Sequence, residues 1–213
     1  MRKSLLIAGA SAAGLLLAAT GAAAAPTSGN SNPGHTYVAD LQPLNAGEHQ
    51  VGSESFSIPT AHGTAVVKLK GNDLTVTINV DGVTPLTLHP QHIHAGSMCP
   101  SASDDVNNDS FVDVIEGLPK YGPVLISLDS NLRSFAPSLD FPVADASGSY
   151  AYTQQASKSH LQKELQEALK VGERHVVIHG IDPSNPLPAT VQSLPGLPAW
   201  ATLPVACGEL VQQ

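Results

Sequence analysis

Two runs of alternating residues, Gly63–Lys70 and Asp73–Val80, constrain the fold of this chain more than any other feature. In the second run, apolar residues occupy every even position from Leu74 to Val80, and polar residues lie between them. A period of two residues places all the apolar side chains on one face of a β-strand. The pair Gly71-Asn72 between the runs is a two-residue turn signal. The sequence therefore predicts an antiparallel hairpin with one buried face.

Short runs rich in Val, Ile and Leu predict six further strands. They are Thr36–Leu41, His89–Ala95, Pro123–Leu128, Ser149–Gln154, Arg174–His179 and Val205–Leu210. One helix is predicted over Ser157–Lys170, where leucines recur at helical spacing. The Pro-rich stretch Pro183–Pro204 is predicted to be a long loop. This pattern favours an all-β sandwich with one short helix across an edge.

The N-terminus predicts a secretory signal peptide over residues 1–24. Two basic residues precede an uncharged run, Leu5–Ala19, which is too short to span a bilayer, and Ala22-Ala23-Ala24 offers small residues for cleavage. An uncleaved N-terminal anchor is the alternative. We expect a flexible lead-in over residues 25–35, one domain over residues 36–213, and a secreted or extracytoplasmic protein that is free of the membrane after cleavage.

The charge of the chain limits its partners. Because Arg2 and Lys3 are the only charged residues of the predicted signal, its removal takes the formal net charge from −8 to −10. So acidic a domain lacks the positive charge that nucleic acids and anionic lipids attract, and we expect neither as a partner. The sequence predicts no particular protein partner.

Two cysteines, Cys99 and Cys207, are present in a chain that is expected to be exported. An even number of cysteines in an oxidising compartment predicts one disulfide. Two buried free thiols are the alternative.

The segment Asp105–Glu116, called the acidic loop below, has the spacing of a calcium-binding loop. Oxygen side chains occupy positions 1, 3, 5, 9 and 12 of its twelve residues, and position 7 offers a backbone carbonyl. The expected calcium ligands are Asp105, Asn107, Asp109, Phe111, Asp113 and Glu116. Ser110 stands where the sharp turn prefers glycine, and nearby prolines and Gly117 argue against a helix on either side. The prediction is a structural calcium ion, and a solvated Asp/Asn turn is the alternative.

His92 and His94 lie two residues apart on a predicted strand, so their imidazoles share one face. Two such imidazoles can bind copper or zinc. For an isolated pair, two histidines without a metal are the simpler interpretation. His179, which ends a strongly apolar strand, is a third candidate ligand, and it shifts the interpretation of the pair towards a metal site.

The order of these motifs resembles that of the copper/zinc superoxide dismutase family, and more closely that of its secreted bacterial relatives of the CHRD-like type. The motifs are His92-Ile93-His94, Cys99, the acidic loop, Val176–His179 and Ala206-Cys207-Gly208. The resemblance spans Thr36–Leu210 and implies a Greek-key β-sandwich or flattened barrel of the superoxide dismutase-like type. It also implies a Cys99–Cys207 disulfide and copper ligation by His92, His94 and His179.

Departures from that family are as informative as the matches. No histidine lies between His94 and His160, so the bridging ligand is missing and no zinc site is expected. Pro204 stands where the enzymes place an arginine that attracts superoxide, and only Arg133 or Arg174 could offset the acidic charge. Candidates for a further copper ligand are His62, His89, His160, His175 and Met98. Of these, His175 is expected to be a surface imidazole too far from His179 to share an ion.

The first functional hypothesis is a secreted metal-binding domain with mononuclear copper-dependent superoxide or other redox chemistry and a structural calcium. The alternative is a non-enzymatic extracellular module that binds metal or a cell surface and keeps the fold without the zinc site. No catalytic residue is assigned. A hydrolase is disfavoured, because the chain has neither a Gly-x-Ser-x-Gly elbow nor a metalloprotease helix. His35 and His49 are expected in loops without a specific role.

Overall fold

The computed structural model describes residues 34–213 apart from 72, 133–137 and 158–173. These residues belong to one compact unit, Asn32–Gln213. The predicted signal peptide, nearly all of the predicted lead-in and residues 158–170 of the predicted helix lie outside the described residues. The domain boundaries after residues 24 and 35 therefore stay predictions.

Strands dominate this unit, and every strand expected from the sequence is present within three residues of its expected bounds. The strands are β1 (His35–Pro43), β2 (Gly47–Val51), β3 (Glu54–Ile58), β4 (His62–Lys70), β5 (Asp73–Asp81), β6 (Gln91–His94), β7 (Val124–Ser127), β8 (Tyr150–Ser157), β9 (His175–His179), β10 (Pro204–Glu209) and β11 (Val211–Gln212). The described helical segments are η1 (Ala102–Asp104), α1 (Val114–Tyr121) and α3 (Ala199–Thr202).

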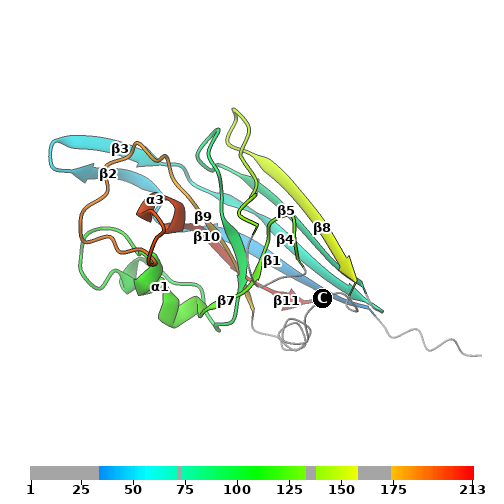
Figure 1. The fold of residues 1–213 in the computed structure, drawn as a ribbon. Helices are drawn as coiled ribbons and strands as arrows, with labels where there is room; N and C mark the ends of the chain where they lie inside the picture. Colours follow the sequence, from blue (N-terminus) through cyan, green and yellow to red (C-terminus); the bar gives the residue numbers. More distant parts are fainter. Residues whose placement is uncertain (1–33, 72, 133–137, 158–173) are drawn as a thin grey trace, which may run out of the picture. The chain divides into compact units, whose positions relative to one another are not determined.

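The strands form one curled antiparallel sheet, in the order β7-β6-β9-β10-β1-β4-β5-β8, with β11 also paired to β1 (Figure 1). Strand β1 belongs to both halves of this sheet, because Tyr37 pairs with Gln212 of β11 whereas Gln42 pairs with Cys207 of β10. The connections β5–β6, β7–β8 and β8–β9 pass from one half to the other, as connections in Greek-key sandwiches do. Strands β2 and β3 form a separate hairpin.

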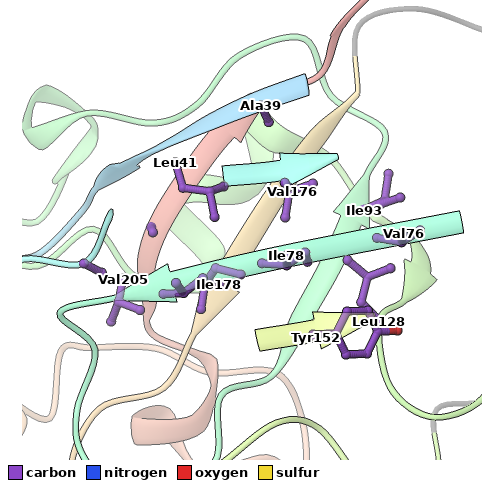
Figure 2. Packing of buried hydrophobic residues seen from close by; sticks show 14 of the residues in the cluster. Ala39, Leu41, Val76, Ile78, Ile93, Leu128, Tyr152, Val176, Ile178 and Val205 are labelled. Atoms are coloured by element: carbon purple, nitrogen blue, oxygen red, sulfur yellow. The ribbon is translucent and has the colours of Figure 1, made fainter. Parts of the chain in front are cut away.

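The core lies between the two halves of the sheet. Figure 2 shows Val76 and Ile78 of β5 lying across Val176 and Ile178 of β9. Alternation along β5 is strict, and its even positions from Leu74 to Val80 are at most 1 % exposed. These buried side chains supply the hydrophobic free energy that holds the curled sheet closed. The predicted all-β sandwich or flattened barrel is thus confirmed.

The turn between β4 and β5 is where the sequence predicts it. The two strands pair in register from His62↔Asp81 to Lys70↔Asp73. Gly71 has a φ of +56°, a backbone conformation that glycine adopts without the steric cost of a side chain.

Three parts of the fold depart from expectation. The hairpin β2–β3 was not predicted, because its residues are mostly polar and lack an apolar face. A helix, α1, starts within the last residues of the acidic loop, at Val114, despite Gly117 and Pro119, since a capping box at its start compensates in part for these residues. The Pro-rich stretch is not one loop, because it contains α3.

Candidate metal centre

Strand β6 presents His92 and His94 on one face, as the His-x-His spacing predicts. Ile93 between them points into the core and is 1 % exposed. Strand β9 is hydrogen-bonded to β6, and it ends at His179, whose backbone N–H donates to Pro90 just before β6. The sheet therefore brings imidazoles from two adjacent strands together, and we call His92, His94 and His179 the histidine cluster.

The rings of the histidine cluster are in mutual contact. Ring centroids lie 5.7 Å apart for His92–His94, 5.4 Å for His92–His179 and 5.9 Å for His94–His179. One ligand nitrogen from each ring falls within 4.8 Å of the other two. Within the described part of the chain, no other group of three His, Cys, Asp or Glu side chains meets this spacing.

Each ring of the cluster has a buried nitrogen without a hydrogen-bond partner. These atoms are Nδ1 of His92, Nε2 of His94 and Nε2 of His179. A buried polar atom without a partner costs about 1–3 kcal/mol, and three of them side by side therefore call for a ligand. A metal ion that accepts three lone pairs fits this arrangement of donors.

Backbone carbonyls fix the tautomer of two of these rings. His94 Nδ1 lies 2.8 Å from the carbonyl oxygen of Gly122, and His179 Nδ1 lies 2.8 Å from that of Thr202. A carbonyl oxygen only accepts, so each Nδ1 carries the proton and each Nε2 keeps its lone pair. Such outer contacts orient histidine ligands in metal sites.

Burial keeps the cluster neutral. Desolvation lowers the pKa of His94 to about 4 and that of His179 to about 3. It also lowers the pKa of His92 well below the ordinary value, and repulsion from the other two rings adds to the effect. All three imidazoles are therefore unprotonated at neutral pH, the form that binds a metal.

Other histidines do not join the cluster. His89 has both ring nitrogens 3.0 Å from carbonyl oxygens, those of His179 and Thr84. His175 lies opposite His94 in the β6–β9 register, but its Nδ1 is 3.0 Å from the carbonyl oxygen of Gly96. His175 is also buried, so the expectation of a surface imidazole is wrong, because β9 runs through the interior from its first residue.

Two further candidates, Met98 and His62, are exposed side chains. His62 Nδ1 lies 3.2 Å from the carbonyl oxygen of Thr60. His160 lies outside the described residues. His35 and His49 are in β1 and β2 and not in loops, and the ring of His49 stacks on Phe111 at 4.4 Å.

A cavity of about 660 Å³ adjoins the cluster, and all three histidines line it. One wall comes from α1, through Val114, Leu118 and Tyr121. Another comes from the segment that leads into α3, through Leu194, Leu197 and Trp200. None of the described residues that line the cavity is charged. No local pattern in the sequence predicts this cavity, because its walls come from separate segments.

The acidic loop uses its oxygens mainly on its own backbone. Asp105 accepts hydrogen bonds from the amides of Asp109 and Ser110, and Glu116 accepts from those of Val106, Asn107 and Asp113. Ser110 has a φ of +74°, which is the sharp turn that position 6 of a calcium loop requires.

Two carboxylates of the acidic loop have further distinguishing contacts. Asp109 Oδ2 is buried without a hydrogen-bond partner. Asp113 caps α1 by accepting from Ile115 and Glu116, and its other oxygen accepts from the amide of Gln192. The structure thus shows a hydrogen-bonded loop, and calcium binding stays a prediction.

The predicted disulfide joins Cys99 to Cys207, with 5.7 Å between the Cα atoms. Cys207 packs against Tyr121, whose ring lies 4.7 Å from that of His94. The disulfide therefore supports the wall on which the cluster rests. It also fits export to an oxidising compartment. No helix among the described residues has the length and apolar character needed to cross a membrane.

Comparison with known proteins gives one family. The family model described as the CHRD domain matches residues 42–184, which include the acidic loop and all three residues of the histidine cluster. No curated protein matches the chain. The matched range ends before Cys207 and before the cavity wall at Leu194–Thr202. Since the match covers most of the chain and agrees with the β-sandwich observed, the protein belongs to the CHRD domain family.

Proposed function

We propose that the histidine cluster binds one copper ion and that the protein is a secreted, copper-binding CHRD domain. The observation that carries this proposal is the histidine cluster itself, in which each ring offers a ligand nitrogen within 4.8 Å of the other two and each ring has a buried nitrogen without a hydrogen-bond partner. Imidazole suits copper and zinc alike, and copper(II) binds nitrogen donors most tightly among the divalent first-row ions. The resemblance to the superoxide dismutase-like superfamily favours copper as well.

Copper with three protein ligands and an open position supplies one-electron redox chemistry when it is bound. Burial keeps the three rings neutral, and the carbonyls of Gly122 and Thr202 orient the rings of His94 and His179. The cavity that leads to the cluster is uncharged among the described residues, so it does not attract superoxide as a charged channel does. This observation favours the second candidate, a non-enzymatic metal-binding or cell-surface module.

We further propose a structural calcium ion in the acidic loop. Its support is the spacing of the oxygens and the sharp turn at Ser110, whose amide donates to Asp105. Asp109 Oδ2, buried without a partner, is the oxygen that gains most from an ion.

Metal analysis of the purified protein and titration with copper and zinc test the copper site. We expect one copper per chain, and a loss of affinity of more than about 100-fold in His94→Gln and His179→Gln. His62→Gln is the matched control, because His62 is exposed and points elsewhere. Wild-type protein that takes up no copper, or variants that bind it as tightly, contradict the proposal.

A superoxide and general redox assay on the same samples separates the two functions. Turnover that is lost in His94→Gln and kept in His62→Gln supports the oxidoreductase. Stoichiometric copper without turnover supports the module.

A further inference from the structure

The cavity beside the histidine cluster is more apolar than a channel for a small ion needs to be. Its volume of about 660 Å³ lies in the range of about 300–1,000 Å³ that is typical of sites for organic ligands. A diatomic anion at the cluster would leave nearly all of this apolar space unused. The geometry therefore points to an occupant with a hydrocarbon body.

Exposed apolar side chains gather at this cavity. The large hydrophobic side chains that are exposed and line it are Leu118, Val124, Leu139, Leu194 and Leu197. They come from α1, β7 and two separate connecting segments, so no local sequence pattern explains their exposure. An exposed apolar patch of this kind marks a binding surface more often than chance placement.

The charge of the bound metal indicates the chemistry of the end of the occupant that lies at the histidine cluster. Imidazole binds a metal as a neutral ligand, so three histidines leave the charge of a bound copper ion uncompensated, and no charged side chain among the described residues lines the cavity. A buried positive charge in apolar surroundings is costly unless an anion accompanies it. An anionic oxygen at the open metal position offsets one of the two charges of copper(II).

We propose that the cavity binds an apolar organic monoanion, with its hydrocarbon body against the cavity wall and its anionic oxygen on the metal. This inference rests on the proposed function, because the anionic head needs the metal. It deepens that function by naming the class of molecule that the site takes.

Trp200 reports on the cavity directly. It lines the cavity and is the only tryptophan of the chain. Decanoate is the probe, and decan-1-ol is its uncharged match with the same hydrocarbon body. Each is titrated into full-length mature protein, metal-free and loaded with one equivalent of copper(II). The readouts are the emission maximum of Trp200 and the visible absorption band of copper.

We expect decanoate to shift both signals in the copper-loaded protein and to bind at least about tenfold more tightly than decan-1-ol. In metal-free protein the two probes should bind with affinities that agree within about twofold. Leu197→Glu places a negative charge at the exposed rim and should weaken decanoate at least about tenfold without changing copper affinity. Val211→Glu is the matched control, because Val211 is exposed but lies in β11, away from the cavity lining.

Each alternative outcome overturns the inference in a recognisable way. Copper uptake with no response to decanoate overturns the ligand and leaves the copper site standing. Equal binding of both probes to copper-loaded protein overturns the metal-bound head. Failure to take up copper, with Trp200 still responding to both probes, overturns the copper site and the anchored anion together. A dimer that Leu197→Glu converts to monomer, with no decanoate binding, assigns the rim to a second copy of the chain.

Discussion

The histidine cluster and the acidic loop are two predicted metal sites that satisfy their polar atoms in opposite ways. In the cluster, each of the three rings has a buried nitrogen without a hydrogen-bond partner. In the acidic loop, Asp105 and Glu116 already accept hydrogen bonds from five backbone amides between them. The cluster is therefore incomplete without a ligand, whereas the loop, apart from the buried Oδ2 of Asp109, is a hydrogen-bonded turn by itself.

This difference concerns free energy as much as geometry. Ligand nitrogens that are buried, neutral and already within 4.8 Å of one another need only a small rearrangement to take a metal. Loop carboxylates must exchange hydrogen bonds for ion contacts, so the net gain from calcium is smaller. We expect copper to act on this protein more strongly than calcium does, and the following tests probe that ranking.

Loss of the disulfide has the largest expected effect, because it supports both regions. The bond closes a loop of 108 residues between Cys99, which precedes the acidic loop, and Cys207 of β10, which packs against Tyr121. Replacing both cysteines by alanine should lower the free energy of unfolding by about 2–5 kcal/mol, measured by urea denaturation. Wild type with and without reductant is the control, and unchanged stability would show that the bond constrains neither region.

The second largest effect is expected on acidification of the metal-free protein, which should lower its free energy of unfolding. Unfolded histidines take up protons near the ordinary pKa of 6.5, whereas folded His94 and His179 do so only at about 4 and about 3. The unfolded state therefore binds more protons in between, and stability falls as the pH drops below 6.5. Between pH 7.5 and pH 5 the expected loss is about 2 kcal/mol for each of these two histidines. Urea denaturation at several pH values measures this loss. If the free energy of unfolding of His94→Gln falls with pH as steeply as that of the wild type, His94 does not contribute to the loss.

Copper binding should stabilise the protein by a free energy of similar size to the loss expected for each histidine, and so raise its melting temperature. At a free copper concentration 100 times Kd, the gain is about 2.7 kcal/mol. For a domain of this size, that gain corresponds to about 5–10 °C. Calorimetry should show the shift in wild type and in Glu116→Gln, but not in His179→Gln. A shift that needs Glu116 would reverse the comparison between the two regions.

Calcium should produce the smallest effect. With a Kd of about 0.1–1 mM, as in extracellular calcium modules, 5 mM calcium adds about 1–2 kcal/mol. Asp105→Asn should abolish this gain, and His179→Gln should keep it. Identical melting curves in calcium and in chelator would leave the acidic loop as a solvated turn.

Much of the fold could be predicted because alternation determines which side chains face inward. The strict period of β5 and the turn at Gly71 specify the hairpin with β4, and the apolar run Val176–Ile178 specifies β9. The same rule places His92 and His94 on one face. The proximity of His179 came from family resemblance, since no local pattern states that β6 and β9 are neighbours.

Other parts could not be predicted because their signals are weak or ambiguous. The β2–β3 hairpin is half-exposed and polar, so its packing on Phe111 through His49 leaves no apolar period. The motif Asp113-Val-Ile-Glu116 carries two meanings, a calcium-loop end and a helix capping box, and only the first was used. The carbonyls of Gly122 and Thr202, which orient the cluster, have no sequence signature at all.

One carboxylate joins features that otherwise look independent. Asp113 starts α1 with one oxygen and holds the amide of Gln192 with the other, so it fastens two walls of the same cavity. It also occupies a predicted calcium position. A change at Asp113 is therefore expected to loosen both walls at the mouth of the cavity, and the calcium ion proposed for the acidic loop would link that mouth to the calcium concentration around the protein.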